Sequence, residues 1–164
     1  MSIKSKRLIL HKFTEDHYDL YCQWYQNEEV MQYITGKALN DEETLNRFNI
    51  VLENNRIDEY FGLFAAFTSA MEYLGVGRLS VTEDQSLEIG FGLFPKFWRQ
   101  GYGTEMMNVL LEHAKSQGKH KQLIAIADPA NKPSIKILTS AGMHRVRQWV
   151  AEDGLNAVQY NMEI

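Results

Sequence analysis

A glycine-bearing turn follows the break at Pro95 and leads into a helix, and its chemistry suits the binding of an anion. Gly101 and Gly103 frame the start of this helix. The first N–H groups of a helix have no partner within it, and the helix dipole adds partial positive charge at the same end. These groups favour an anion, and a pyrophosphate suits the turn.

Two common nucleotide-binding motifs do not fit this segment. Gly90 and Gly92 begin a pattern whose third glycine, in a dinucleotide-binding loop, would stand at the position of Pro95. The Walker motif is missing because no Gly-Lys-Ser or Gly-Lys-Thr follows the turn. A nucleotide-dependent phosphotransferase also needs a lysine and acidic metal ligands, which do not stand at suitable positions here.

The segment just before Pro95 places one carboxylate beside two glycines. Over residues 87–93 the alternation puts Glu88, Gly90 and Gly92 on one face of a predicted strand and apolar side chains on the other. A face this bare leaves room for a slender ligand. It equally allows a helix to pack closely, with Glu88 solvated at the rim, and the residues alone leave both interpretations open.

The elements that position these residues are predicted from periodicity and capping signals. The first helix is expected to begin at the cap Thr14 and to bury Tyr18, Tyr21, Cys22 and Tyr25. A bulge is expected near Gly75 and Gly77, where the alternation slips. The predicted strands are residues 7–13, 61–67, 74–81, 87–93, 123–127, 145–150 and 157–162, and the predicted helices are 15–27, 28–34, 41–55, 102–117 and 132–141.

Composition limits the class of protein. The 164 residues are 45% hydrophobic and 23% charged, which is typical of one globular domain spanning 1–164. The net charge of −4 without a Lys/Arg cluster argues against nucleic acid and favours cationic partners. No apolar run reaches the ~20 residues of a membrane span, and no signal peptide is evident. We therefore expect a cytoplasmic protein with no membrane partner, either a monomer or a homodimer.

Metal and thiol chemistry have little support in the sequence. The five histidines lack metal-ligand spacing, and Cys22 is the only cysteine, so no metal is expected and no disulfide can form within the chain. We interpret Cys22 as a buried apolar residue that packs among tyrosines.

Trp98-Arg-Gln-Gly-Tyr-Gly-Thr-Glu105 resembles the acyl-CoA pyrophosphate loop, Gln/Arg-x-x-Gly-x-Gly/Ala, of the GNAT N-acetyltransferase superfamily. Arg7-Leu-Ile-Leu10, residues 27–34 and Glu88-Ile-Gly90 narrow the resemblance to the RimJ/RimL branch, which includes N-terminal protein acetyltransferases. The resemblance covers nearly the whole chain in the right order. It implies an α/β (α+β) fold with a mixed, mostly antiparallel central sheet flanked by helices.

The resemblance also implies how acetyl-CoA would bind. The strand backbone at Leu93 and Phe94 would pair with pantetheine amides, and Asn131, the expected cap of the helix 132–141, would make a second contact. The pyrophosphate would be held by the N–H groups of the turn, from Arg99, Gln100, Gly101, Tyr102, Gly103 and Thr104.

Acetylation of an amine needs a general base, a donor to the oxyanion and a general acid for the leaving thiolate. By resemblance Glu88 is the base. The tyrosine that serves as the acid in many GNAT enzymes maps onto Leu138, which cannot donate a proton, so the role passes to Ser134 as in the RimJ/RimL branch. Other hydroxyl groups that could substitute belong to Tyr33, Tyr60, Tyr102 and Tyr160.

Three functions stay open at this point. The resemblance favours an N-acetyltransferase acting on a primary amine such as the N-terminus of a ribosomal protein. Related enzymes acetylate polyamines, amino acids or antibiotics, and an acidic chain fits any cation. Because Leu138 cannot donate a proton, the third open function is a module that binds acyl-CoA without catalysis.

Overall fold

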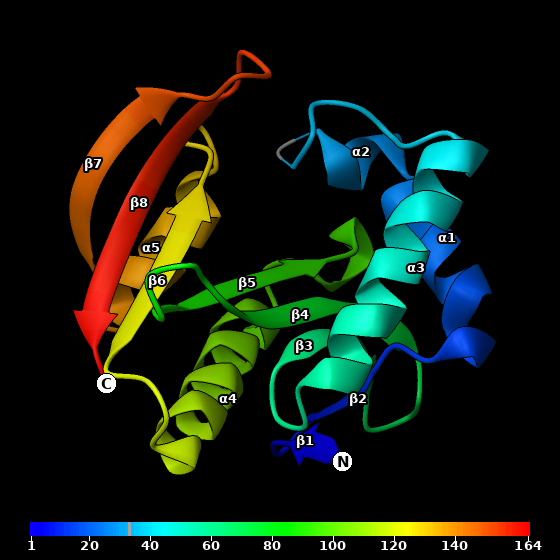
Figure 1. Ribbon diagram of the computed structural model, residues 1–164, viewed down its shortest axis with the longest axis horizontal. Coiled ribbons are helices and arrows are strands. Elements are labelled where there is room, and N and C mark those ends of the chain that lie inside the picture. The colour runs from blue at the N-terminus through cyan, green and yellow to red at the C-terminus, as the bar shows by residue number, and fades with distance from the viewer. Residues whose placement is uncertain (33) are drawn as a thin grey trace.

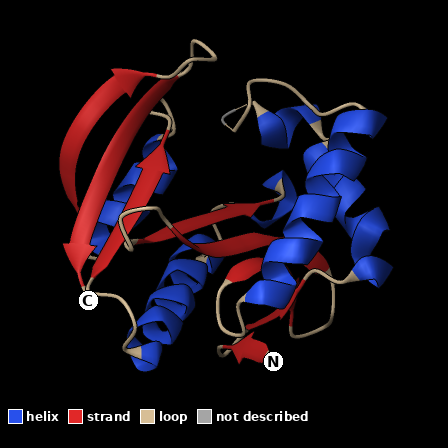
Figure 2. Ribbon diagram, viewed as in Figure 1, coloured by secondary structure: helices blue, strands red, loops and turns tan. Residues whose placement is uncertain are grey.

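The computed structural model describes residues 1–32 and 34–164, and its centre is an eight-stranded sheet (Figures 1 and 2). The strand order is β1-β2-β3-β4-β5-β6-β8-β7. All neighbouring strands are antiparallel except β5 and β6, which are parallel. The prediction of a mixed, mostly antiparallel sheet flanked by helices is confirmed. The strands are β1 Ser2–Lys4, β2 Leu8–Lys12, β3 Gly62–Thr68, β4 Tyr73–Val81, β5 Leu87–Leu93, β6 Gln122–Ala127, β7 His144–Val150 and β8 Asn156–Glu163.

Helices cover both faces of the sheet, and each face has its own apolar core. Short 3₁₀ turns at Glu15–His17 and Pro95–Phe97 precede α1 and α4. One core joins the sheet to α4 and α5, and the other joins it to α1, α2 and α3 (Figure 1). In the described residues no helix is both long and apolar enough to cross a membrane. The helices are α1 Tyr18–Tyr25, α2 Glu28–Met31, α3 Asp41–Ile57, α4 Tyr102–Gln117 and α5 Lys132–Ser140.

The helix boundaries follow local signals closely at three places. Asn40 and Glu43 form the expected capping box of α3, in which the Asn40 side chain accepts from the Glu43 N–H at 2.9 Å. The Asn131 side chain accepts from the Ser134 N–H at 3.4 Å and caps α5. Gly118 ends α4 with φ of +61°.

Other boundaries differ from the prediction. The short strand β1 had no sequence signal, and the helix expected from Thr14 begins as a 3₁₀ turn before α1. The buried residues of α1 are Tyr21 and Trp24, whereas Cys22 and Tyr25 are only half-buried. The bulge lies at Leu74, because Gly75 pairs with Ala66 and Tyr73 with Phe67.

Candidate active site

The parallel strands β5 and β6 pair at two positions and then separate. Leu87 pairs with Leu123 and Glu88 with Ile124. Beyond them β6 continues alongside β8 and β5 alongside β4, so the two strands diverge (Figure 1). A small cavity of about 40 Å³ occupies the gap between them. Its walls are Ile89, Gly90 and Phe91 from β5, Ala125, Ile126 and Ala127 from β6, and Ser134 and Leu138 from α5.

The backbone of β5 faces this gap at alternate residues. The Phe94 N–H donates to the Leu74 carbonyl at 3.0 Å, so the preceding residue, Leu93, directs its N–H and carbonyl away from β4. The Leu93 carbonyl accepts from the Trp98 indole at 2.8 Å, which leaves the Leu93 N–H pointing toward the gap. The Phe94 carbonyl accepts from the Phe97 N–H at 2.9 Å. Both backbone groups of Phe94 are thus engaged, so Leu93 is the better placed of the two residues expected to pair with pantetheine.

The turn that precedes α4 has the geometry of an anion-binding loop. Arg99 and Gly101 both have positive φ values, +59° and +82°. No side chain caps the helix, whose first turn contains Tyr102, Gly103 and Thr104. In the part of the chain that the structure describes, no protein acceptor takes the N–H groups of residues 101–104. These groups are available to a ligand.

Gly103 has a packing role as well as a place in this turn. It is buried, and a Cβ there would lie 2.8 Å from Cδ1 of Ile137 on α5. The glycine therefore lets α4 approach α5 closely.

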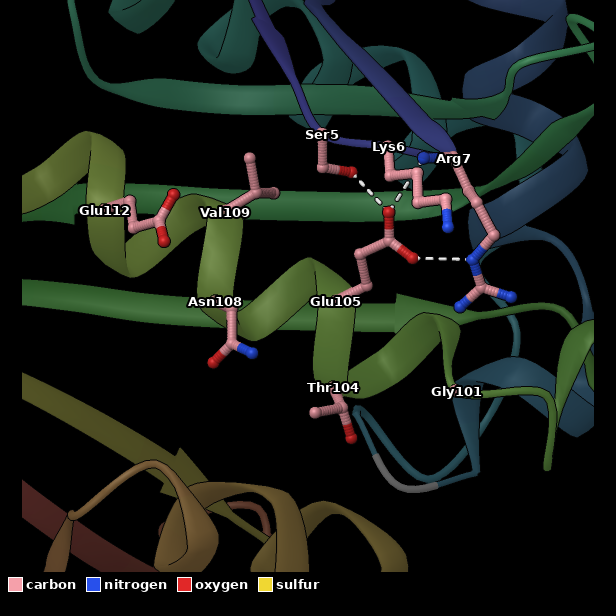
Figure 3. A pocket seen from close by; sticks show the side chains of 9 residues that line it. All are labelled: Ser5, Lys6, Arg7, Gly101, Thr104, Glu105, Asn108, Val109 and Glu112. Atoms are coloured by element: carbon pink, nitrogen blue, oxygen red, sulfur yellow. Dashed lines mark hydrogen bonds and ion pairs between the residues drawn. The ribbon is translucent and has the colours of Figure 1, made fainter.

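Arg7 and Glu105 fasten this turn to the hairpin formed by β1 and β2 (Figure 3). The Arg7 Nε contacts Glu105 Oε2 at 2.7 Å, and Arg7 Nη1 donates to the Gln100 carbonyl at 3.0 Å. The guanidinium also lies over the Tyr102 ring, 4.2 Å from its centroid. Sequence reasoning assigned Arg7 and Glu105 no role, although both stand in the motifs quoted above. A cavity of about 350 Å³ adjoins them on the outer face of α4.

Glu105 is held as a carboxylate by these partners. Besides Arg7 Nε it accepts from the Ser5 hydroxyl at 2.7 Å and from the Arg7 N–H at 2.8 Å. Burial by itself would raise the pKa of Glu105, but the hydrogen bonds from Ser5 and Arg7 and the charge of Arg7 outweigh it and lower the pKa.

Glu88, the predicted base, is paired with Arg78 on the neighbouring strand β4. Arg78 Nη2 donates to Glu88 Oε1, and the side chains are 45% and 19% exposed. Arg78 stands opposite Gly90, and a Cβ at Gly90 would lie 3.4 Å from Arg78 Nε. A Cβ at Gly92 would lie 2.5 Å from the Trp24 ring. Close packing of a helix therefore explains Gly92, because Trp24 of α1 occupies the space beside it. At Gly90 the half-exposed side chain of Arg78 occupies that space instead.

Ser134 and Glu88 lie on opposite faces of the sheet. Ser134 lines the cavity together with Leu138, which is 3% exposed and belongs to the core beneath α4 and α5. Glu88 lies on the other face, where Arg78 meets it. Of the two predicted catalytic groups, Ser134 alone lines the cavity in the described residues, and Glu88 lies beside the point where β5 and β6 separate.

The alternative tyrosines do not gather at this passage. Tyr60 lies beneath Lys119, Tyr102 beneath Arg7, and Tyr160 is buried in the core on β8. None of these three lines the gap cavity in the described residues, and Tyr33 lies outside them. Across the same described residues, no three His, Cys, Asp or Glu side chains come together in a way that could hold a metal ion.

Comparison with known families decides the class of this protein. The profile of the acetyltransferase (GNAT) domain matches residues 7–144, which include β2, the turn before α4 and all of α5. The chain belongs to the GNAT family of acetyltransferases. The uncharacterized N-acetyltransferase p20 of Bacillus licheniformis is 21% identical over 147 residues, covering 88% of this chain and 83% of p20.

Solved GNAT structures share the fold over essentially the whole chain. One is the Salmonella typhimurium acetyltransferase that modifies the N-terminal serine of ribosomal protein L7/L12, with a TM-score of 0.83, 18% identity and coverage of 100% and 99%. Another is spermidine N-acetyltransferase from Vibrio cholerae, solved with CoA and spermine, with a TM-score of 0.81, 12% identity and coverage of 97% and 96%. This GNAT protein is accordingly an acyltransferase with the family fold.

Proposed function

We propose that this GNAT protein transfers an acetyl group from acetyl-CoA to a primary amine at the gap between β5 and β6. The observation that carries the proposal is the separation of these strands just after Glu88, with the unpartnered N–H groups of residues 101–104 near the far end of β5. An extended pantetheine can pair with the free edge of β5, as an added strand does. The pyrophosphate then reaches the turn before α4.

The residues at the gap supply the proton transfers that the reaction needs. Glu88 takes a proton from the amine, directly or through water, and the amine nitrogen attacks the thioester carbonyl carbon. The C–S bond breaks as the new C–N bond forms. Ser134 lines the gap and gives its hydroxyl proton to the leaving thiolate, and it recovers a proton from solvent. Leu138 at the same gap has no proton to give.

A narrower form of the proposal places the enzyme in the RimJ/RimL branch, acting on a protein N-terminus in the cytoplasm as a monomer or homodimer. The likeness to the L7/L12 serine acetyltransferase supports this form. The equal likeness to spermidine N-acetyltransferase, at a TM-score of 0.81 against 0.83, supports a small amine just as well. The acceptor must therefore be identified by assay.

The decisive experiment combines CoA binding with acetyl transfer. Purified protein is incubated with acetyl-CoA and a panel of amines and peptides, while free CoA thiol and the mass of each acceptor are measured. An enzyme releases thiol in step with a gain of one acetyl group on an acceptor. A module that binds acyl-CoA without catalysis binds CoA but releases no thiol with any acceptor, and that outcome would overturn the proposal.

Glu88→Gln tests the base independently of the acceptor's identity. The variant should turn over more slowly than the wild type, and its deficit should shrink as the pH rises and the amine loses its proton unaided. The pH–rate profile of each protein is measured at saturating acetyl-CoA. Identical profiles for the two proteins would remove Glu88 from the role of base.

A further inference from the structure

The predicted base is already neutralised by a guanidinium. Arg78 donates to Glu88 across the β4–β5 hairpin, and Glu88 is the more buried of the two side chains, at 19% exposed against 45%. The Arg78 side chain lies over Gly90, where no Cβ intervenes. An incoming amine therefore meets an ion pair rather than a lone carboxylate.

The surroundings of this pair add positive charge. Burial raises the pKa of the Tyr25 hydroxyl on α1, and the two charged groups that act on it in the opposite direction are Arg78 and Arg47 of α3. Arg78 and Arg47 thus both lie near Tyr25 on this side of the sheet, although the chain as a whole carries a net charge of −4.

Two kinds of acceptor would meet this ion pair differently. An acceptor that brings only a positive charge must take Glu88 from Arg78 and leave the guanidinium without a counter-ion. An acceptor that also carries a carboxylate can replace Glu88 on Arg78, because a guanidinium binds a carboxylate through two parallel hydrogen bonds. Glu88 is then free to accept the proton of the amine.

We infer that Arg78 is a specificity-determining residue, and that the acceptor is a primary amine bearing a carboxylate close to it. An α-amino acid fits this description, as does a peptide whose first residues include an acidic side chain. The inference rests on the proposed acetyltransferase function and names the acceptor class for the same site. Arg78 takes no part in the proton transfers themselves.

Matched acceptor pairs, in which one member carries a carboxylate and the other does not, test the inference. The pairs are β-alanine against propylamine, alanine against alaninamide, and Ser-Asp-Ala against Ser-Asn-Ala peptides with amidated C-termini, with spermidine as a polycation. The wild type should show kcat/KM up to about tenfold higher for the anionic member of each pair, since a half-exposed charge pair has only part of the effect of a buried one. The preference should lie mainly in KM.

Arg78→Gln supplies the second arm, and Arg56→Gln is its control. The Arg78→Gln variant should lose the preference for two reasons. Anionic acceptors no longer find a guanidinium to bind their carboxylate, and Glu88 is no longer paired when an acceptor without a carboxylate arrives. Arg78→Lys keeps the charge without the bidentate geometry and should retain part of the preference. Arg56 forms its ion pairs with Glu15 and Glu53, so its replacement should leave the preference intact. Circular dichroism of each variant verifies that it is folded.

The outcomes separate this inference from the proposed function. If the wild type acetylates both members of each pair equally, or prefers spermidine, the acceptor assignment is overturned while acetyl transfer stands. If Arg78→Gln is folded and keeps the full preference, Arg78 is not its source. If no acceptor releases thiol from a protein that binds CoA, the proposed function fails and the inference fails with it.

Discussion

Replacement of Glu105 by glutamine measures how firmly the first turn of α4 is fastened to the N-terminal hairpin. The Glu105 carboxylate accepts hydrogen bonds from the Ser5 hydroxyl, the Arg7 N–H and the Arg7 Nε, at 2.7, 2.8 and 2.7 Å. Glutamine has the same size and keeps one oxygen acceptor. Its amide group, however, would turn two hydrogens toward the Arg7 Nε–H, so that a charge-assisted hydrogen bond becomes a contact between donors.

The expected loss follows from the exposure of the pair. A hydrogen bond to a charged group contributes about 1.5–3 kcal/mol to stability. Arg7 is 39% exposed and Glu105 18%, so solvent screening reduces the contribution to about 1–2 kcal/mol. For a protein of this size, that corresponds to a melting temperature lower by roughly 2–8 °C at neutral pH.

The loss should also depend on pH in a defined direction. Burial would raise the pKa of Glu105, but Ser5 and Arg7 lower it below the ordinary value of 4.5. A carboxyl group whose pKa is lower in the folded state stabilises the protein fully above its unfolded pKa. This stabilisation disappears as the pH falls through the lower, folded value. The wild type and Glu105→Gln should therefore differ fully at pH 7 and converge below about pH 4.5.

Thermal unfolding followed by circular dichroism between pH 7 and pH 3 tests this reasoning. Glu112→Gln is the matched control, because Glu112 lies on the same helix beside the same cavity, is exposed, and forms no salt bridge among the described residues. The control should have the same melting temperature as the wild type at every pH in this range. Equal melting temperatures for wild type and Glu105→Gln at pH 7, or a difference that persists undiminished at pH 3, would refute the reasoning.

Three further substitutions probe the gap and its supports. Ser134→Ala should lower turnover while acetyl-CoA affinity stays unchanged, and normal turnover in a steady-state assay would exclude the donor role. Gly92→Ala would bring a methyl group within 2.5 Å of the Trp24 ring, so urea unfolding should show a loss of about 1–3 kcal/mol, and unchanged stability would contradict that packing. Lys12→Met keeps the apolar stem but removes the ammonium that donates to the Asp58 carbonyl at the end of α3, and should cost about 1 kcal/mol in the same assay. No loss would show that this cap is dispensable.

The parts of the site that the sequence predicted are those with local causes. The turn around Gly101 needs a residue with positive φ and, within a few residues of it, the start of a helix. The glycines and Pro95 indicate both features in the sequence. The caps Asn40 and Asn131 bond to N–H groups three residues away. Such features depend on neighbours along the chain, so the residue types alone indicate them.

The parts that the sequence could not predict depend on phase and register between elements. The aromatic residues of α1 lie on several sides of the helix, so its apolar pattern fits more than one buried face. The face that includes Trp24 is buried because Gly92 leaves room for the indole. Arg78 meets Glu88 because Arg78 pairs with Gly90. That pairing depends on the strand register, and nothing in the spacing of two charged residues fixes it.

The topology of the sheet explains why the turn before α4 and the gap lie together. Two parallel neighbours require a crossover connection, here α4, and a crossover begins where the first strand ends. The connection that makes β5 and β6 parallel therefore also places the N–H groups at the start of α4 near the end of β5. Each strand keeps an antiparallel partner on its outer side, β4 for β5 and β8 for β6, so the pair can separate after Glu88 without unravelling the sheet. The backbone groups that the separation leaves without a strand still need hydrogen-bond partners, and an extended amide chain ending in a diphosphate offers partners to the strand and to the turn at once.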